Sequence, residues 1–165
     1  MSEQQTAAIN SAENVVRAIF SPAMIDNAGN ISKAAFSLRH NEDYISVARM
    51  SIEGWLNDIK SIPVSGNRKL VGYGKMKVCD IKSLDVPFFR KPIVFDVEAK
   101  ATKKNQSHAG ITITYDGEQL RGDKVSFLKP VQEMYPTSML MLKIQTNLAN
   151  LTNQNFIKIQ NTLAD

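Results

Sequence analysis

The stretch PIVFDVEAKA, residues 92–101, alternates apolar and polar side chains, and this alternation decides the fold class. One face holds Ile93, Phe95, Val97 and Ala99, and the other holds Asp96, Glu98 and Lys100. Successive side chains of a β-strand point to opposite faces, so the pattern predicts a strand with one buried and one solvated face. Strands of this kind are typical of antiparallel sheets.

Further strand patterns lie on both sides of this stretch, at residues 15–20, 43–50, 69–79, 109–115 and 124–128. The connections between the later segments are too short for crossover helices, so we expect a largely antiparallel sheet of about five strands. The dipeptide Asp116-Gly117 indicates a hairpin, with a loop that the residues up to Asp123 make longer than the tightest kind. Gly72 and Gly74 indicate a bulge or the close approach of another backbone.

Two segments have a helical period instead. Residues 52–60 carry Ile52, Trp55, Leu56 and Ile59 on one stripe. We expect Ser51 to cap this amphipathic helix and Trp55 to be largely buried against the sheet. A C-terminal helix, capped by Thr137 or Ser138, is expected to pack on the sheet and to resume over residues 156–164. Strands and helices that segregate in this way predict an α+β fold.

Size and composition are those of one globular domain. The chain has 165 residues, of which 43% are apolar and 22% are charged. We expect a flexible tail over residues 1–12 and a single domain over residues 13–165. Cys79 is the single cysteine, which excludes an intramolecular disulfide. No secretory leader and no apolar run long enough to span a membrane are visible, so we expect a cytoplasmic protein.

The net charge of +4 is concentrated in the middle of the chain. Residues 68–104 contain ten basic and four acidic side chains, whereas residues 1–62 contain five basic and seven acidic ones. A basic segment can attract nucleic acid, but no recognition motif or aromatic stacking pattern accompanies it. Lysines more often keep a sheet soluble or protect an exposed strand edge, so we do not expect nucleic acid as a partner.

The usual catalytic and metal motifs are absent. Two histidines and one cysteine, without ligand spacing, exclude a structural zinc site, and no Gly-x-Ser-x-Gly elbow or complete phosphate loop occurs. The sequence identifies no cofactor. Arg17 in one strand and Ser46 in a later one resemble, over these few residues, the front end of ADP-ribosyltransferases, but the glutamate pattern of that family does not follow. We assign the sequence to no family.

Three arginines in the first third of the chain are the best candidates for ligand binding. Arg17 and Arg49 lie within strand-like apolar segments, and Arg39 follows a short helical turn at residues 33–36. A guanidinium group cannot shed its charge, so each arginine needs a carboxylate or a bound anion. Structural ion pairs with nearby acids account for such arginines most simply. The alternative is a site for an anionic small molecule.

His108 and Ser107 are a second candidate pair. They end the polar loop KKNQSHAG, residues 103–110, immediately before a strand. A histidine at the mouth of a pocket can act as a general acid or base, and Ser107 can bind a ligand. The simpler interpretation is a histidine that only makes hydrogen bonds in a surface loop. We nevertheless expect Arg17, Arg49 and His108 to lie near one cleft.

Three function classes follow. The leading hypothesis is a small binding or accessory protein that acts through self-association or a protein partner, for which the apolar, methionine-containing residues 134–142 offer a surface. The alternative is an enzyme acting on a nucleotide or phosphorylated small molecule, with arginines as anion clamps and His108 as the catalytic residue. A nucleic-acid-binding module through residues 68–104 ranks last. The sequence does not decide whether the protein is an enzyme.

Overall fold

One antiparallel sheet organises the chain in the computed structural model, which describes residues 8–86, 91–122 and 138–159. Its strands, within these residues, are β1 Asn14–Ser21, β2 Ile45–Arg49, β3 Lys69–Lys77, β4 Ile93–Ala99, β5 His108–Tyr115, β6 Glu118–Gln119 and β7 Phe156–Lys158. The strand order is β4-β5-β2-β1-β3-β7, and β6 pairs with β5. The helices are η1 Lys33–Phe36, α2 Trp55–Lys60, α3 Val78–Lys82 and α4 Ser138–Asn153. The predicted α+β fold is confirmed, with seven described strands, two of them very short, in place of about five.

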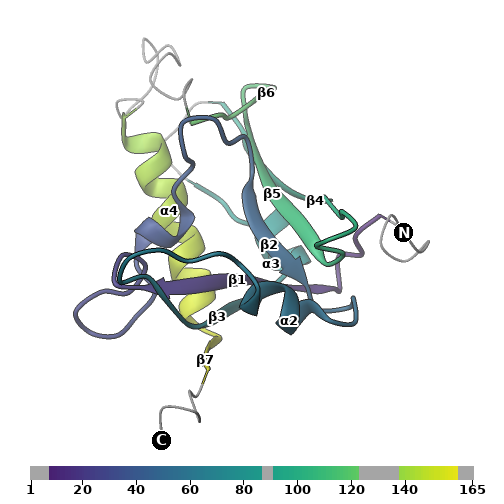
Figure 1. Cartoon of the computed structure of the whole chain (residues 1–165). Coiled ribbons are helices and arrows are strands. Elements are labelled where there is room, and N and C mark those ends of the chain that lie inside the picture. The colour runs from purple at the N-terminus through teal and green to yellow at the C-terminus, as the bar shows by residue number, and fades with distance from the viewer. Residues whose placement is uncertain (1–7, 87–90, 123–137, 160–165) are drawn as a thin grey trace, which may run out of the picture.

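Apolar side chains cover both faces of this sheet. The larger core lies between the sheet and the C-terminal helix α4, and includes Ile19, Phe95, Ile111 and Ile144 (Figure 1). A smaller cluster on the opposite face joins Val16, Ala18 and Phe20 of β1 to Ile59 of α2. Alternate residues of β1 therefore serve two cores, as the period of a strand requires.

The sheet opens between β1 and β2. These strands pair only through Val15 with Arg49 and Val16 with Ala48, whereas β1 pairs with β3 along its whole length. Beyond Val16 the two strands diverge. In Figure 1, β1 and β3 run roughly from side to side, whereas β2 and β5 run roughly from top to bottom. Beyond Val16, no ladder of backbone hydrogen bonds therefore joins β1 to β2.

The predicted helix at residues 52–60 is shorter than expected. Its helical residues begin at Trp55, because Gly54 precedes it with a φ of 88° in the left-handed region, and Ser51 does not cap it. The Ser51 hydroxyl donates to Glu13 instead. Trp55 is only partly buried and stands edge-on to Tyr73, with 5.2 Å between ring centroids. Trp55 thus lies at the edge of the smaller cluster and not at its centre.

Two further expectations are wrong. Asp116 and Gly117, with φ of 52° and 78°, form a two-residue hairpin turn between β5 and β6. The hairpin loop is therefore of the tightest kind and not longer, as the sequence had suggested. The predicted helix at residues 156–164 is replaced at its start by β7, which pairs with β3. The expected strand at residues 124–128 lies outside the described residues.

Glycine permits β7 to approach β3 closely. A Cβ atom added to Gly72 would collide with the backbone oxygen of Ile157, which confirms the predicted close approach of another backbone at this glycine. At the other end of the chain, residues 1–7 of the expected tail lie outside the described residues, whereas Ile9 already packs against the larger core. None of the described helices has both the length and the apolar composition needed to cross a membrane.

Candidate functional site

A cavity of about 770 Å³ lies where β1 and β2 diverge. Its lining includes Phe20 and Arg17 of β1, Ser46 of β2, Asp58 of α2 and His108 of β5. The volume falls within the range of small-molecule sites, which is about 300–1,000 Å³. The opening of the sheet is therefore the candidate site.

Arg17 is the central cation of this cavity. Its Nε donates to the backbone oxygen of Ala35 and its Nη1 to that of Ser46, both at 2.8 Å. Within the described residues, it makes no ion pair with a carboxylate, and Nη2 has no hydrogen-bond partner. Burial lowers the pKa of Arg17 to about 10; the charge of Glu42 raises it, and those of Arg39 and Arg68 lower it further. Arg17 is still a cation at neutral pH.

Two more arginines line the cavity. Arg68 places its guanidinium carbon 4.1 Å from the centre of the Phe20 ring, in a cation–π contact. Arg39 is exposed, and its backbone N–H donates to Glu42 Oε1 at 2.8 Å. The lining residues thus include three arginines and two acidic residues, Glu42 and Asp58. The excess of positive charge favours an anion in the cavity.

His108 meets Arg17 at Ser46. The His108 Nε2 atom lies 3.2 Å from the Ser46 hydroxyl, while Arg17 binds the backbone oxygen of the same serine. The Tyr44 ring stands edge-on to the imidazole, with 5.8 Å between centroids. Burial lowers the pKa of His108, the backbone of Lys100 raises it through a hydrogen bond, and the charge of Lys100 lowers it, for a net decrease. His108 is therefore neutral at pH 7, and its Nε2 can accept the Ser46 proton.

Ser107 acts on the cavity indirectly. It is fully buried, and its hydroxyl and backbone N–H donate to Asp58 Oδ2 at 2.6 and 3.2 Å. Ser107 does not line the cavity, but its hydrogen bonds hold Asp58, which does line it. Asn105, two residues earlier, is also a lining residue, and its buried Oδ1 has no hydrogen-bond partner in the described part of the chain.

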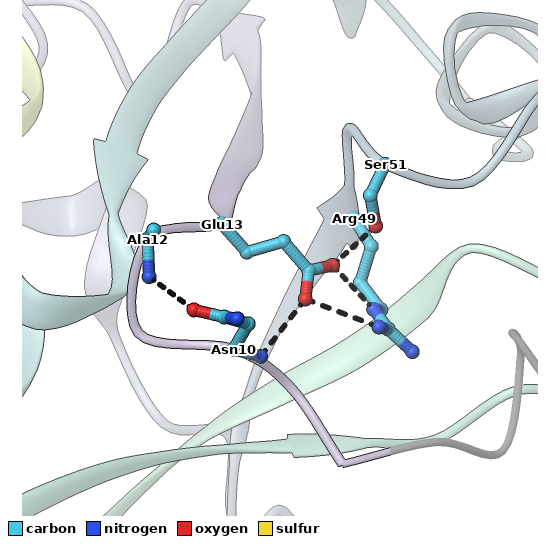
Figure 2. A network of polar contacts seen from close by, with 5 residues as sticks. All are labelled: Asn10, Ala12, Glu13, Arg49 and Ser51. Atoms are coloured by element: carbon cyan, nitrogen blue, oxygen red, sulfur yellow. Dashed lines mark hydrogen bonds and ion pairs between the residues drawn. The ribbon is translucent and has the colours of Figure 1, made fainter.

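Arg49 belongs to a separate network (Figure 2). Its Nε and Nη2 bind the two carboxylate oxygens of Glu13 at 2.8 and 3.1 Å, and Ser51 and the backbone N–H of Asn10 bind the same carboxylate. Only 4% of the Arg49 side chain is exposed, and Arg49 does not line the cavity. The structure thus brings Arg17, Arg39 and His108 together but holds Arg49 apart, because Glu13 already supplies its carboxylate.

The Glu13 carboxyl responds to this network. Burial alone raises the pKa of Glu13, but hydrogen bonds from Arg49, Ser51 and Asn10 outweigh that effect and lower it. The carboxylate therefore stays ionised in the folded protein at neutral pH. This bidentate pair is a structural ion pair, the simpler of the two interpretations that the arginines allowed.

Sequence reasoning missed Arg68, Asp58 and Asn105. Arg68 follows a loop that contains Pro63 and Gly66, and Asp58 lies on the polar side of a short helix, where a carboxylate is usually only solvated. No local pattern marks Arg68 or Asp58, because they come close to the other lining residues only through the folding of α2 and the residue 100–107 loop against the sheet. The ending of a polar loop on a strand, which pointed to His108, also gave a signal for the nearby Asn105.

Neither a cluster of metal ligands among the described residues nor a similar known protein helps to identify the ligand of this site. Over the ranges that the structure describes, no three His, Cys, Asp or Glu side chains cluster as metal ligands do. No protein-family model matches the sequence, and neither a curated protein nor a solved structure is significantly similar to it. The candidate function therefore has to be argued from the cavity alone.

Proposed function

We propose that this protein binds a small molecule carrying a phosphate or carboxylate group in the cavity between β1 and β2. The observation that carries the proposal is Arg17, a cation with a burial-lowered pKa that makes no ion pair with a carboxylate in the described chain. Arg17 is partly buried, and a charge withdrawn from water is costly unless an opposite charge accompanies it. The charge of Glu42 favours the Arg17 cation, whereas the charges of Arg39 and Arg68 disfavour it, and a bound anion would offset this repulsion.

The rest of the lining supports a ligand with an apolar body. Phe20, Met24, Ile59 and Pro63 present apolar surface beside the arginines. Sites of this kind combine apolar walls with a few polar groups that fix the orientation of the ligand. Arginine is suited to the anionic end, because its planar fork matches phosphate and carboxylate oxygens in pairs.

Calorimetric titration with inorganic phosphate, phenyl phosphate and benzoate tests this proposal. We expect at least one of these anions to bind, and Arg17→Lys to weaken its binding by about tenfold, because lysine keeps the charge but loses the fork. Arg68→Gln should weaken binding as well and disturbs the fold less, since Arg68 makes no contact as buried as those of Arg17. Lys82→Gln, an exposed cation outside the cavity, is the control and should bind like the wild type.

The proposal fails if the folded protein binds none of the three anions. It also fails if both arginine variants bind as tightly as the control. A role through self-association or a protein partner is the weaker proposal, because in the region that suggested it Leu140 is buried in the chain's own core and Met141 packs against that core. Residues 134–137 of that region lie outside the described residues.

A second candidate function is an enzyme that transfers or hydrolyses a phosphoryl group, and the contact of His108 with Ser46 favours it. A nucleophile within hydrogen-bond reach of a neutral imidazole is the arrangement that activates serine. The Ser46 oxygen would attack phosphorus while His108 takes the hydroxyl proton and then gives it to the leaving oxygen. A water molecule would then attack phosphorus while His108 takes its proton, and His108 would return that proton to the Ser46 oxygen as phosphate leaves.

Release of phenol from phenyl phosphate tests this candidate. We expect Ser46→Ala and His108→Gln each to lower the rate by a factor of about 10² or more, while Ser46→Ala still binds inorganic phosphate. Because the pKa of His108 lies below 6.5, the rate should rise with pH up to that pKa and be flat from pH 7 to 8. Binding of phenyl phosphate without turnover would leave a binding protein only.

A further inference from the structure

The guanidinium groups of Arg17 and Arg68 both offer accessible donors to the cavity. In the described part of the chain, neither Nη2 of Arg17 nor any guanidinium nitrogen of Arg68 has a hydrogen-bond or ion-pair partner. Both residues are partly buried, yet the one buried side-chain nitrogen or oxygen without a partner among the described residues is Asn105 Oδ1. The unpartnered nitrogens of the two arginines are therefore accessible, and both residues line the cavity.

Phe20 holds Arg68 in the neighbourhood of Arg17. The guanidinium carbon of Arg68 lies 4.1 Å from the centre of the Phe20 ring, and Phe20 lies three residues beyond Arg17 on β1, about 10 Å at the rise of a strand. Besides burial, which lowers the pKa of Arg17 most, the charges of Arg39 and Arg68 lower it. The three arginines thus form one group of mutually repelling positive charges.

Glu42 compensates only part of this charge. After burial, its negative charge has the largest effect on the pKa of Arg17 and raises it. Asp58, the other acidic lining residue, accepts two hydrogen bonds from Ser107 at Oδ2, at 2.6 and 3.2 Å. Arg17 and the charges that act on it are therefore three positive and one negative, an excess of two. A carboxylate carries one negative charge, whereas a phosphate monoester carries nearly two at neutral pH.

We propose that the anionic group of the ligand is a doubly charged phosphate that Arg17 and Arg68 bind together, and not a carboxylate. This inference rests on the proposed anion site and names the ligand class that the site prefers, small phosphate monoesters. Arg17 donates from Nη2, and Arg68 gains acceptor oxygens that the ring of Phe20 does not offer. Guanidinium groups suit this role, because their paired N–H donors match the oxygens of a phosphate.

Calorimetric titration with phenylphosphonate and benzenesulfonate at pH 8 measures the effect of the second charge. Both probes carry a tetrahedral group with three oxygens on a benzene ring, but at this pH the phosphonate is doubly charged and the sulfonate singly charged. His108 is neutral at pH 8 and adds no charge to the comparison. We expect phenylphosphonate to bind at least about tenfold more tightly at one fixed ionic strength, because the second guanidinium attracts the second charge.

Substitutions in the arginine group test the source of this preference. Arg68→Gln should reduce the preference for phenylphosphonate several-fold, whereas Arg68→Lys, which keeps the charge, should retain most of it. Arg39→Gln removes another charge of the same group from an exposed side chain and should also reduce the preference. Lys82→Gln, outside the cavity, is the control and should keep the wild-type preference.

Each other result overturns a defined part of the argument. Equal affinities of the wild type for the two probes refute the doubly charged ligand and leave the anion site standing. An unchanged preference in Arg68→Gln refutes the role of Arg68, and a preference lost equally in Arg68→Lys shows that its charge is not the cause. Failure of both probes to bind refutes the inference, and failure of inorganic phosphate as well refutes the anion site on which it rests.

Discussion

Glu13 and Arg49 form the best-connected polar pair in the described structure, and the pair predicts a stability effect. Glu13→Gln would leave the Arg49 guanidinium almost buried, with only 4% of its side chain exposed and without its carboxylate. Breaking a buried pair on one side costs about 3–5 kcal/mol, so we expect a loss of this size in the free energy of unfolding measured with urea. Asp96→Asn is the control, because its pair with Lys82 spans 3.8 Å between half-exposed side chains and should contribute about 0–1 kcal/mol.

The same pair predicts how stability changes with pH. The pKa of Glu13 is lower in the folded protein than its ordinary value of 4.5, so the unfolded chain binds the proton more readily. The contribution of this carboxylate is therefore complete above pH 4.5 and is lost as the pH falls through the folded pKa. Between pH 5 and pH 3 the wild type should lose more stability than Glu13→Gln. Parallel curves for the two proteins would contradict this assignment.

Arg17 and Arg49 show where sequence reasoning about single residues ends. Both lie in apolar strand segments, and the sequence predicted a carboxylate or a bound anion for each; the structure shows such a partner for Arg49 alone, in Glu13. They differ because Glu13 immediately precedes β1, where it meets Arg49 at the end of β2, whereas Arg17 lies one residue past Val16, the last residue of β1 that pairs with β2. The acid that neutralises one arginine and not the other is selected by strand register, which is not a property of either residue.

Local patterns were sufficient for most elements, because a strand or helix that buries one face must repeat its apolar residues with a fixed period. The alternation over residues 92–101 became β4, and the apolar stripe of the C-terminal helix became the buried face of α4. The residues after α4 were assigned incorrectly because three apolar or amphipathic residues fit either a helix or a strand. A strand forms at β7 because Gly72 of β3 has no side chain and so leaves space for the backbone of β7.

The cavity could not be predicted, although several of its residues were. Its existence depends on β1 leaving β2 after two residue pairs, a long-range property without a sequence pattern. Once the sheet opens there, Arg17 and His108 meet at Ser46, while Arg68 and Asp58 arrive from segments that looked like solvated surface. The early end of the pairing between β1 and β2 thus brings together residues that lie as far apart in the sequence as Arg17 and His108.

The distribution of charge over the whole molecule bears on the remaining function class, nucleic-acid binding through residues 68–104. Arg68 faces the cavity, and three lysines of this region lie near carboxylates, in the pairs Lys82–Asp96, Lys91–Asp116 and Lys100–Glu98. The local excess of positive charge in the sequence is therefore reduced on the folded surface. Phosphate contacts by lysine and arginine supply most of the affinity of non-specific binding, so this distribution disfavours it.

We accordingly expect no binding of duplex DNA or single-stranded RNA at physiological salt. Fluorescence anisotropy with labelled oligonucleotides, titrated at low and physiological salt, measures this directly, since binding through phosphate contacts weakens steeply as salt rises. Weak binding that is confined to low salt is compatible with a mildly basic protein. Micromolar binding at physiological salt, weakened by Lys75→Gln and Lys77→Gln and not by Arg17→Lys, would contradict the expectation. It would also move the functional surface from the cavity to the exposed side of β3.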